Sequence, residues 1–490
     1  MPARNPQIFG VGILGRSPAV TSQRRVNCYV DIQEENDRAR AAIYGCAGLT
    51  SLAYMGDGPV RGVHAPPDHP YLYAVHRATL YRVANDGGLT ALGTLYTSTG
   101  WVCFASGHLN AASERWMMLV DGTSGYAYDL QGETFEEITD PEFVTAPRSC
   151  AYSDGYFLVN RGNDTGIWDI SAAADDPTGW TGLDFASAES KGDRLERIFA
   201  YQGVVALLGG ESTEYWSYTG DSAFPFARNI GMRHDWGLAA RASVAEFGDM
   251  GIALMRSTMG EVVVQALHPA GPEIVSPPDL VRVLNDYGTV ADAIGASFME
   301  SGHAMYLLTF PTEQKSWQYD GRTRVWCERQ TGADGGAYAG AHAAVLNGVT
   351  RLGGRADGYI YTLAPGTYTD NGEVQIRKVV SEHVHLPGNA MLRAGELWVD
   401  MEEGVGVDGG GQGTAPLAML RVSRDKGQSW GPAHVTALGA IGKTRTRVRW
   451  RRLGRGPDLT FELSVSDPVK FVVTGEHLRL AAARGSGRAA

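Results

Sequence analysis

A unit of three or four short strands recurs through most of this 490-residue chain. Each unit has an apolar strand, a polar turn, an aromatic-rich strand and a further strand, at a spacing of roughly 40–50 residues. One such unit cannot bury both faces of its sheet, whereas units stacked around an axis can, so the repeat predicts a β-propeller. The units open on YLYAV (71–75), WMMLV (116–120), YFLVN (156–160), VVALL (204–208), GIALM (251–255), AMYLLTF (304–310) and VTRLGG (349–354).

The last unit of the repeat is incomplete. It ends at GYIYTL (359–364), and an unpaired strand, GLTSLAYM (48–55), stands just before the first unit. A strand from the beginning of the chain can complete the last sheet and close the ring. This count predicts seven blades, with six as the alternative, within residues 48–365. The stretch PDLVRVLNDYG (278–288), between the fifth and sixth units, predicts an inserted helix or a structured loop.

The pattern changes after residue 365. EVQIRKVVSEHVHL and AGELWVDMEEGVGV alternate apolar and polar residues, as strands with one buried face do. Similar stretches continue to KFVVTGEHLRL, which predicts a smaller C-terminal β-sandwich at residues 366–480. Residues 1–47 are then an N-terminal arm, and we expect the tail at 481–490 to be disordered. The predicted fold class is therefore all-β.

Charge and cysteine content indicate the environment of the chain. The net charge of −11 does not favour attraction of the whole molecule to nucleic acid, although the chain turns basic from Lys443 onward. Five scattered cysteines without a CxxC pair predict neither a disulfide framework nor a zinc module, and fit assembly in a reducing cytosol. The early stretch IFGVGILG is short and interrupted by glycine, so we do not expect a signal peptide.

The stretch SRDKGQSW (423–430) matches the Asp box, a motif of sialidases and other propeller glycosidases. The motif builds a turn: Asp425 can accept hydrogen bonds from backbone N–H groups, and Gly427 can adopt a positive φ. Trp430 can fold back onto the base of the hairpin. Because this box occurs once and lies outside the repeats, we interpret Ser423, Asp425, Gly427 and Trp430 as a structural turn.

Motifs for catalysis or cofactor binding are not apparent in the sequence. A glycosidase needs two carboxylates that face one sugar, and no spacing here implies such a pair. HExxH and P-loop motifs do not occur. His383 and His385 share one face of a predicted strand, but no third metal ligand lies nearby. We therefore expect no catalytic, cofactor-binding or metal-binding residues, and no enzyme.

An arginine row follows the Asp box, within TRTRVRWRR (444–452). In a strand, Arg445, Arg447, Arg449 and Arg451 share one face, while Val448 and Trp450 lie on the other. The apolar face packs inward and leaves a row of arginines outside. This row predicts a contact with phosphates or with an acidic partner surface. The alternative is a solvated face that neighbouring Asp and Glu neutralise.

Four stretches of the sequence resemble one known family, the tail-hub or packaged-DNA stabilisation proteins of short-tailed bacteriophages. They span most of residues 20–480, and their order along the chain is more specific than any one of them. The stretches are SQRRVNCYVDIQEENDRARAAIYGCAGLTSLAYMGDGPVRGVHA (22–65), GDSAFPFARNIG (220–231), TVADAIGASFMESGHAMYLLTFPTEQKSWQYDGRTRVWCER (289–329) and LRVSRDKGQSWGPAHVTALGAIGKTRTRVRWRRLGRGPDLTFELSVSDPV (420–469).

The resemblance implies a structural virion protein, assembled in the host cytoplasm into a homohexameric ring below the portal and its adaptor. Such a ring extends and closes the DNA channel and docks tail fibres or spikes and the terminal plug. Double-stranded DNA passes through it without sequence-specific contacts, and no cofactor or membrane insertion is implied. The arginine row then contacts the adaptor, because bound phosphates would slow DNA ejection.

The Asp box keeps two other hypotheses open. One is a propeller glycosidase or depolymerase that acts on host polysaccharide. The other is a carbohydrate-binding tail module without turnover.

Overall fold

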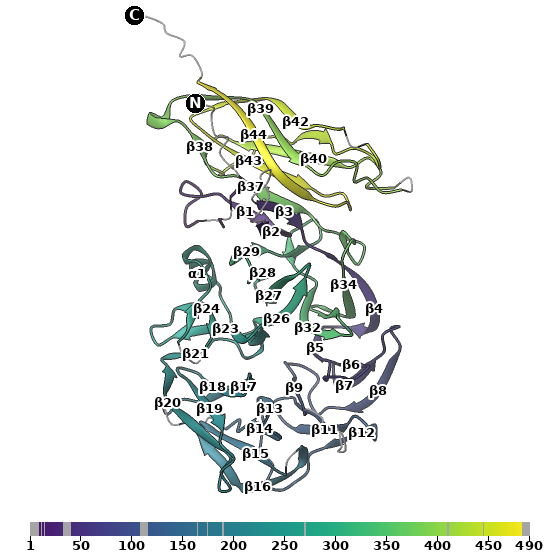
Figure 1. The fold of residues 1–490 in the computed structure, drawn as a ribbon, viewed down its shortest axis with the longest axis vertical. Helices are drawn as coiled ribbons and strands as arrows, with labels where there is room; N and C mark the ends of the chain where they lie inside the picture. The colour runs from purple at the N-terminus through teal and green to yellow at the C-terminus, as the bar shows by residue number, and fades with distance from the viewer. Residues whose placement is uncertain are drawn as a thin grey trace, which may run out of the picture. The chain divides into compact units, whose positions relative to one another are not determined.

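The computed structural model describes residues 9–482, apart from residues 11, 14, 33–40, 108–115, 164, 174, 189–190, 269–270, 409–410 and 444. The regular secondary structure described is almost all β-strand, with a single α-helix, α1 (Pro278–Asn285), within the stretch predicted to be a helix or a loop (Figure 1). None of the described helices has the length and apolar character needed to cross a membrane.

The chain divides into two compact units. Unit 1 comprises residues 1–50, 315–338 and 364–490, and unit 2 comprises residues 51–314 and 339–363. The sixth repeat is therefore divided between the two units. Its strands before residue 315 belong to unit 2, and its strands from residue 315 onward belong to unit 1. All five cysteines are buried free thiols.

Unit 2 contains antiparallel strands from each of the seven repeats in chain order, and the sixth repeat contributes only one hairpin to this unit (Figure 1). The first four have four strands each: β5 (Val60–His64), β6 (Leu72–His76), β7 (Thr79–Val83) and β8 (Leu89–Thr94); β9 (Cys103–Ser106), β10 (Trp116–Val120), β11 (Gly125–Asp129) and β12 (Thr134–Glu137); β13 (Cys150–Ser153), β14 (Tyr156–Asn160), β15 (Ile167–Ala173) and β16 (Asp176–Ser187); β17 (Leu195–Tyr201), β18 (Val204–Gly209), β19 (Thr213–Tyr218) and β20 (Phe226–His234).

In the fifth sheet the strand that lies nearest the propeller axis is broken in two. β21 and β22 both pair with β23, and the short 3-10 turn η1 (Arg241–Ser243) separates them. The strands of the remaining sheets in unit 2 are β21 (Trp236–Leu238), β22 (Ala245–Phe247), β23 (Met250–Ser257), β24 (Val262–Leu267) and β25 (Glu273–Ile274); β26 (Ile294–Glu300) and β27 (His303–Phe310); and β32 (Gly340–Leu346), β33 (Val349–Gly354) and β34 (Asp357–Ala364).

The sheets form a closed ring. Each sheet contacts the next along the chain, and β32 of the seventh contacts β5 of the first. The described part of unit 2 is therefore a seven-bladed propeller, the first of the two predicted counts. The strand β4 (Gly48–Asp57) follows β34 in the last sheet, as predicted for GLTSLAYM. The ring of Tyr54 lies 4.6 Å from that of Tyr359 at this closure.

Neighbouring blades pack through alternate apolar side chains. Between the first two blades, the buried side chains of Val75 and Leu80 pack with Met117 and Tyr126. Because successive strand residues point to opposite faces, each blade presents one apolar set to the blade before it and another to the blade after it. Equivalent clusters join the second blade to the third, the third to the fourth, the fourth to the fifth, and the seventh to the first.

Two histidines lie on the strands that meet at the ring closure. His64 is in β5 and His342 is in β32. Burial lowers the pKa of each imidazole to about 4, so both rings are neutral at pH 7. The Nε2 atom of His64 lies 2.8 Å from Ser106 Oγ.

We expect acid to destabilise the propeller through His342. The pKa of the ring is about 4 in the folded chain and about 6.5 when unfolded, so its contribution is complete above pH 6.5 and is lost as the pH falls toward 4. The loss between pH 7 and pH 4 should be about 2–3 kcal/mol. Chemical unfolding of wild type and His342→Gln at both pH values measures it. An equal acid-induced loss in the two proteins would contradict the prediction.

Unit 1 contains two sheets packed face to face, which confirms the predicted β-sandwich. The first sheet includes β29 (Val325–Glu328), β1 (Arg24–Val26), β37 (Arg377–Val380), β43 (Asp458–Val465), β40 (Leu417–Ser423) and β41 (His434–Ala437), in that order, with β38 (Val384–His385) beside β43. The second consists of β2 (Cys28–Ile32), β3 (Ala41–Gly45), β44 (Val472–Ala482), β39 (Leu392–Met401) and β42 (Val448–Gly456).

The remaining elements of unit 1 are short, apart from the strand β28 (Lys315–Asp320), which pairs with β29. They are β30 (Gln330–Thr331), β31 (Gly336–Ala337), β35 (Thr369–Asp370), β36 (Glu373–Val374) and the 3-10 turn η2 (Pro387–Asn389).

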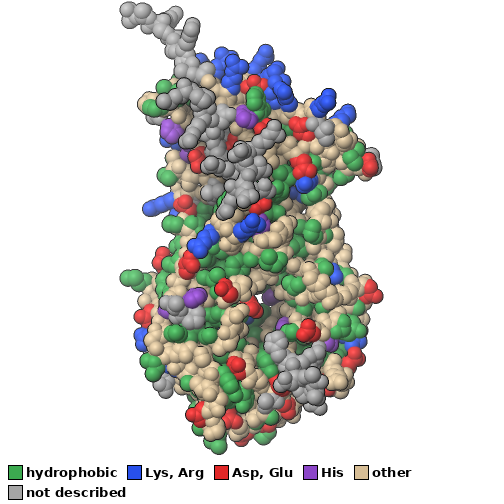
Figure 2. Space-filling view, in the orientation of Figure 1, with side chains coloured by type: hydrophobic (Ala, Val, Ile, Leu, Met, Phe, Trp, Pro, Cys, Tyr) green, Lys and Arg blue, Asp and Glu red, His purple; other side chains and the backbone are tan. Residues whose placement is uncertain are grey.

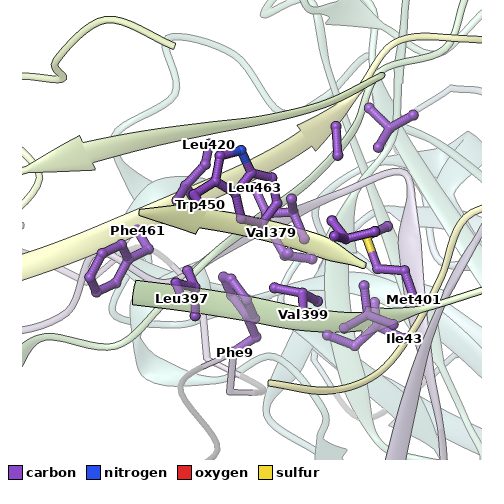
Figure 3. Close-up of a cluster of buried hydrophobic side chains, with 14 of the residues drawn as sticks. Phe9, Ile43, Val379, Leu397, Val399, Met401, Leu420, Trp450, Phe461 and Leu463 are labelled. Carbon is purple, nitrogen blue, oxygen red and sulfur yellow. The ribbon is translucent and has the colours of Figure 1, made fainter. Parts of the chain in front are cut away.

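The core of the sandwich lies between its two sheets (Figure 3). Leu397 of β39 and Trp450 of β42 come from one sheet, and Leu420 of β40 and Phe461 of β43 come from the other. All four side chains are almost inaccessible to solvent. Alternation along the strands places these apolar residues inside and their polar neighbours outside.

The residues expected to form an arm are part of this sandwich. β1 pairs in antiparallel fashion with β37, where Arg24 lies opposite Val380, and β3 pairs with β44. Phe9 is 2% exposed and packs in the same core. The described residues among the first 47 thus fold into unit 1. Of the tail expected to be disordered, residues 481–482 end β44 and residues 483–490 lie outside the described structure.

Candidate docking face of the sandwich

The two units carry opposite charge. Unit 2 contains 16 Lys and Arg against 34 Asp and Glu, a formal net charge of −18. Unit 1 contains 27 Lys and Arg against 20 Asp and Glu, a formal net charge of +7. The basic character that the sequence shows after Lys443 therefore belongs to a unit that is basic as a whole.

The Asp-box residues form a compact turn after β40. Asp425 Oδ1 accepts hydrogen bonds from Ser423 Oγ at 2.7 Å and from the backbone N–H of Ser429 at 2.9 Å. Ser423 Oγ in turn accepts the N–H of Gly427 at 2.8 Å. Hydrogen bonds to the carboxylate, chiefly from Ser429, lower the pKa of Asp425 to about 2. The Asp425 carboxylate thus holds its own turn, which is the structural role predicted for the motif.

The other two Asp-box residues differ in how closely they are held. Gly427 has a φ of +82°, and a Cβ at this position would lie 2.8 Å from the Cβ of Ser22. Glycine is therefore required both by the backbone conformation and by the close approach of the N-terminal segment. Trp430 is half-buried, and the described core of the sandwich does not include it.

The arginine row is only partly in a strand. β42 begins at Val448, so Arg449 and Arg451 lie in the strand, whereas Arg445 is in the turn before it and Arg447 follows that turn. The expected strand over all four arginines is therefore too long. The predicted alternation holds within β42, where Val448 and Trp450 are buried in the core.

Neighbouring strands extend the basic surface. Across the sheet, Arg451 lies opposite Glu396 of β39, which lies opposite Arg479 of β44. Arg455 lies opposite Arg393. We call the outward side of these three strands, with the turn that leads into β42, the arginine face. It consists of Arg393, Arg445, Arg447, Arg449, Arg451, Arg455 and Arg479, and Figure 2 shows Lys and Arg side chains gathered over this part of unit 1.

One carboxylate neutralises part of the arginine face. Glu396 Oε1 lies 3.1 Å from Arg449 Nε and 3.4 Å from Arg451 Nε. Within the described chain, the other five members of the face form no ion pair. The face therefore keeps a surplus of exposed guanidinium groups, which favours contact with carboxylates or phosphates of a partner.

A groove of about 250 Å³ opens at one end of the arginine face. Trp398, 39% exposed, lies opposite Arg449 on one side and His477 on the other. The Trp398 and His477 rings are 4.8 Å apart, and His477 Nε2 lies 3.1 Å from Asp400 Oδ2. An exposed aromatic ring beside arginines is typical of interface residues that carry binding energy. Sequence reasoning missed Trp398, whose only signal was an aromatic residue on the polar side of an alternating strand.

His383 and His385, the two histidines considered as metal ligands, lie in different environments. His383 is held by Pro18 O, 2.6 Å from Nε2, and by Thr460 Oγ1, 3.0 Å from Nδ1. His385 is exposed. In the part of the chain that the structure describes, no three His, Cys, Asp or Glu side chains are grouped as metal ligands would be.

Comparison with solved structures and curated proteins is uninformative. The computationally designed Ika8 protein is 10% identical with a TM-score of 0.37, over 64% of this chain and 100% of that chain. The extracellular domain of the one-component system BT4673 from B. thetaiotaomicron is 7% identical with a TM-score of 0.44, over 64% of this chain and 40% of that chain. Neither likeness supports an inference about function. No curated protein matches the sequence.

Two protein-family models match the chain. The model described as the β-propeller of bacteriophage P22 Gp10 matches residues 21–368, and the model described as the β-sandwich of the same protein matches residues 377–481. The propeller model alone covers more than half of the sequence. Together the two models account for both folds seen in the structure, in the same order along the chain. The chain therefore belongs to the bacteriophage P22 Gp10 family, the DNA-stabilisation and tail-hub proteins of short-tailed phages, and is a phage tail structural protein.

Proposed function

We propose that this chain is the subunit of a homohexameric tail hub that sits below the portal and its adaptor. The ring extends the DNA channel, helps to close it after packaging, and docks tail fibres or spikes and the terminal plug. The observation that carries this proposal is the match of both folded parts to the P22 Gp10 family. A ring of identical subunits needs a heterologous contact that closes on itself.

The charge of the two units supports this role. The net charge of −18 on unit 2 suits a channel wall that repels DNA phosphates and lets the duplex slide without sequence-specific contacts. The arginine face of unit 1 suits a fixed contact with an acidic partner, which we assign to the adaptor. A strongly basic lumen in the assembled ring would contradict the first of these assignments.

The proposal is tested by assembly. Purified protein is mixed with portal–adaptor complex, and the mass of the product is measured by light scattering after size-exclusion chromatography. We expect six copies of the chain to add to one portal–adaptor complex. A monomer in isolation is compatible with the proposal, because recruitment can precede ring closure. Failure to associate with the portal–adaptor complex would count against a hub.

The arginine face should contribute to this docking. Replacing Arg445, Arg447 and Arg449 together by Ser removes three guanidinium groups, two of which have no ion-pair partner in the described chain. We expect about a tenfold weaker affinity for the adaptor, with the loss smaller at high salt. Titration of labelled adaptor at two salt concentrations measures both effects.

Two arginines of unit 2 that lie outside the arginine face provide the control. Arg233→Ser and Arg282→Ser remove side chains that pair with Asp235 and Asp286, outside the arginine face. Neither should change adaptor affinity. Unchanged docking of the triple variant, combined with loss of packaged DNA from its virions, would instead assign the arginine face to DNA.

Polysaccharide cleavage remains the alternative function. Incubation of the purified protein with capsule, lipopolysaccharide and sialoside substrates should release no sugar. Sugar release would favour a depolymerase over a hub, and glycan binding without release would favour a carbohydrate-binding tail module.

A further inference from the structure

The two cysteines of unit 2, Cys103 and Cys150, lie against each other. Cys103 is the first residue of β9, the innermost strand of the second blade, and Cys150 is the first residue of β13, the innermost strand of the third. The other cysteines of the chain, Cys28, Cys46 and Cys327, belong to unit 1. Two thiols that are 47 positions apart in the sequence thus meet where two blades join.

Hydrogen bonds hold the two thiols together. Cys103 Sγ donates to the backbone O of Cys150 at 3.3 Å and accepts the N–H of Cys150 at 3.5 Å. Cys150 Sγ lies 3.8 Å from Met118 O, and the two thiols are also hydrogen-bonded to each other. Each is 3% exposed and packs in the apolar cluster between the second and third blades. A disulfide between them shortens an existing contact and does not have to bring distant strands together.

The contact makes the two sulfurs chemically unequal. The hydrogen bond from the Cys150 thiol lowers the pKa of Cys103, whereas burial raises the pKa of Cys150 well above its ordinary value. The guanidinium group of Arg197 opposes the effect of burial at both sulfurs. Because the thiolate is the nucleophilic form, Cys103 is the sulfur that reacts first, and Cys150 is placed to react with the product.

We propose that Cys103 and Cys150 form a disulfide bond, which locks the second blade to the third, when the virion leaves the reducing cytosol of its host. The oxidant is a peroxide, which is small enough to reach a buried thiol. The Cys103 thiolate attacks one peroxide oxygen, the O–O bond breaks, and a sulfenic acid forms. The Cys150 sulfur then attacks the Cys103 sulfur, the S–O bond breaks, and the hydroxyl group leaves as water. Two thiols and one hydrogen peroxide give one disulfide and two water molecules, so the sulfurs lose the two electrons that the peroxide gains.

The bond has a different value inside and outside the host cell. The free thiols of the described structure correspond to the reduced form, which is the form that the cytosol maintains while the chain folds. After release, the bond constrains the unfolded chain and stabilises the closed propeller relative to it. The inference depends on the chain being a virion component and not on the proposed hexameric hub, so ring assembly and bond formation are tested separately.

Peroxide treatment of the full-length protein tests the bond. Protein purified with a reductant, then freed of it, is treated with hydrogen peroxide, and the remaining thiols are alkylated. Peptide mass spectrometry should show Cys103 linked to Cys150, and the melting temperature should rise by about 5 °C or more until a thiol reductant is added. Cys327→Ser, which removes a buried thiol of unit 1, should behave like wild type. Alkylation of both Cys103 and Cys150 after treatment, or a disulfide without a rise in melting temperature, would overturn the proposal.

Serine variants test the order of the two steps. In Cys150→Ser the sulfenic acid on Cys103 has no second thiol to react with, so dimedone, which labels sulfenic acids, should label Cys103. In Cys103→Ser, labelling of Cys150 should be about tenfold weaker, because its thiol stays protonated. Equal labelling in the two variants would contradict this order and the assignment of Cys103 as the reactive sulfur. Alanine replaces serine at either position if the serine variant does not fold.

The timing of the bond is tested in the phage itself. Virions collected after lysis should carry the disulfide, whereas chain alkylated inside intact host cells before lysis should carry two free thiols. A disulfide already present inside the cells, or free thiols in the virions, would count against a bond that forms on release.

Discussion

Replacing Arg61 by Ala should lower the free energy of unfolding of the propeller by about 3–5 kcal/mol. Arg61 is 4% exposed, and its guanidinium joins the end of the first blade to the loop that leads into the second. Nε donates to Gly100 O at 2.7 Å, Nη1 to Arg77 O at 2.6 Å and Thr97 O at 2.8 Å, and Nη2 to Thr99 O at 2.7 Å. Alanine leaves these carbonyls without their donor in a space that its methyl group cannot fill.

Urea unfolding followed by far-UV circular dichroism measures the effect. Arg256→Ala is the matched control, because Arg256 is an exposed arginine of β23 in the same unit, and it should change stability by less than about 0.5 kcal/mol. Arg61→Lys should recover little of the loss, since one ammonium group cannot reach carbonyls that diverge around a planar fork. A loss below about 1 kcal/mol in Arg61→Ala would show that water replaces the guanidinium.

Replacing Phe9 by Ala should destabilise unit 1 by about 3–4 kcal/mol. The Phe9 ring is 2% exposed and packs in the core between the two sheets, where Figure 3 shows it near Leu397. Its backbone N–H donates to Glu476 Oε1 at 3.2 Å, so the N-terminal segment is fixed at a defined depth. Removing the ring opens a cavity that the surrounding strands cannot close.

Val20→Ala controls for a general effect of truncating the N-terminal segment. Val20 is 76% exposed, and its replacement should leave stability within about 0.5 kcal/mol of wild type. Phe9→Leu should restore about half of the loss by refilling most of the cavity. If Phe9→Ala unfolds at the same urea concentration as wild type, the ring does not contribute to the sandwich core.

The propeller could be predicted because its signal is local. Each blade is built from strands adjacent in sequence, joined by tight turns, so alternation and turn residues identify it without any long-range pairing. The closing strand could also be predicted, since the last unit has one strand too few and one strand remains before the first unit. The seven-bladed ring follows from these two observations together.

Which segments of the chain belong to unit 1 depends on strand pairings that have no local signal in the sequence. Val26 of β1 lies opposite Glu328 of β29, some three hundred residues later in the chain. Phe9 lies in the stretch IFGVGILG, whose glycines and short length argue against a targeting signal but do not distinguish a core segment from a loop. Such choices are settled by tertiary burial, which the sequence of the segment does not encode.

The candidate site likewise has residues that the sequence predicts and residues that it does not predict. Arg449 and Arg451 were found from alternation within one strand, and the error over Arg445 and Arg447 concerns only where that strand begins. Trp398, by contrast, joins them only through pairing of β39 with β42. A site that combines residues from several strands can be recognised only when the pairing of those strands is known.

The strand β4 that completes the last blade has a consequence for the order of synthesis. β4 ends at Asp57, whereas its partner β34 begins at Asp357, so the ribosome must add about three hundred residues before the pair can form. At roughly 5–20 residues per second, this delay lasts on the order of 15–60 s. During that interval the nascent chain carries a ten-residue strand whose edges are open to neighbouring polypeptides. Polysomes translating this message therefore hold several such strands in close proximity, and a chaperone that shields them should raise the yield of closed propellers.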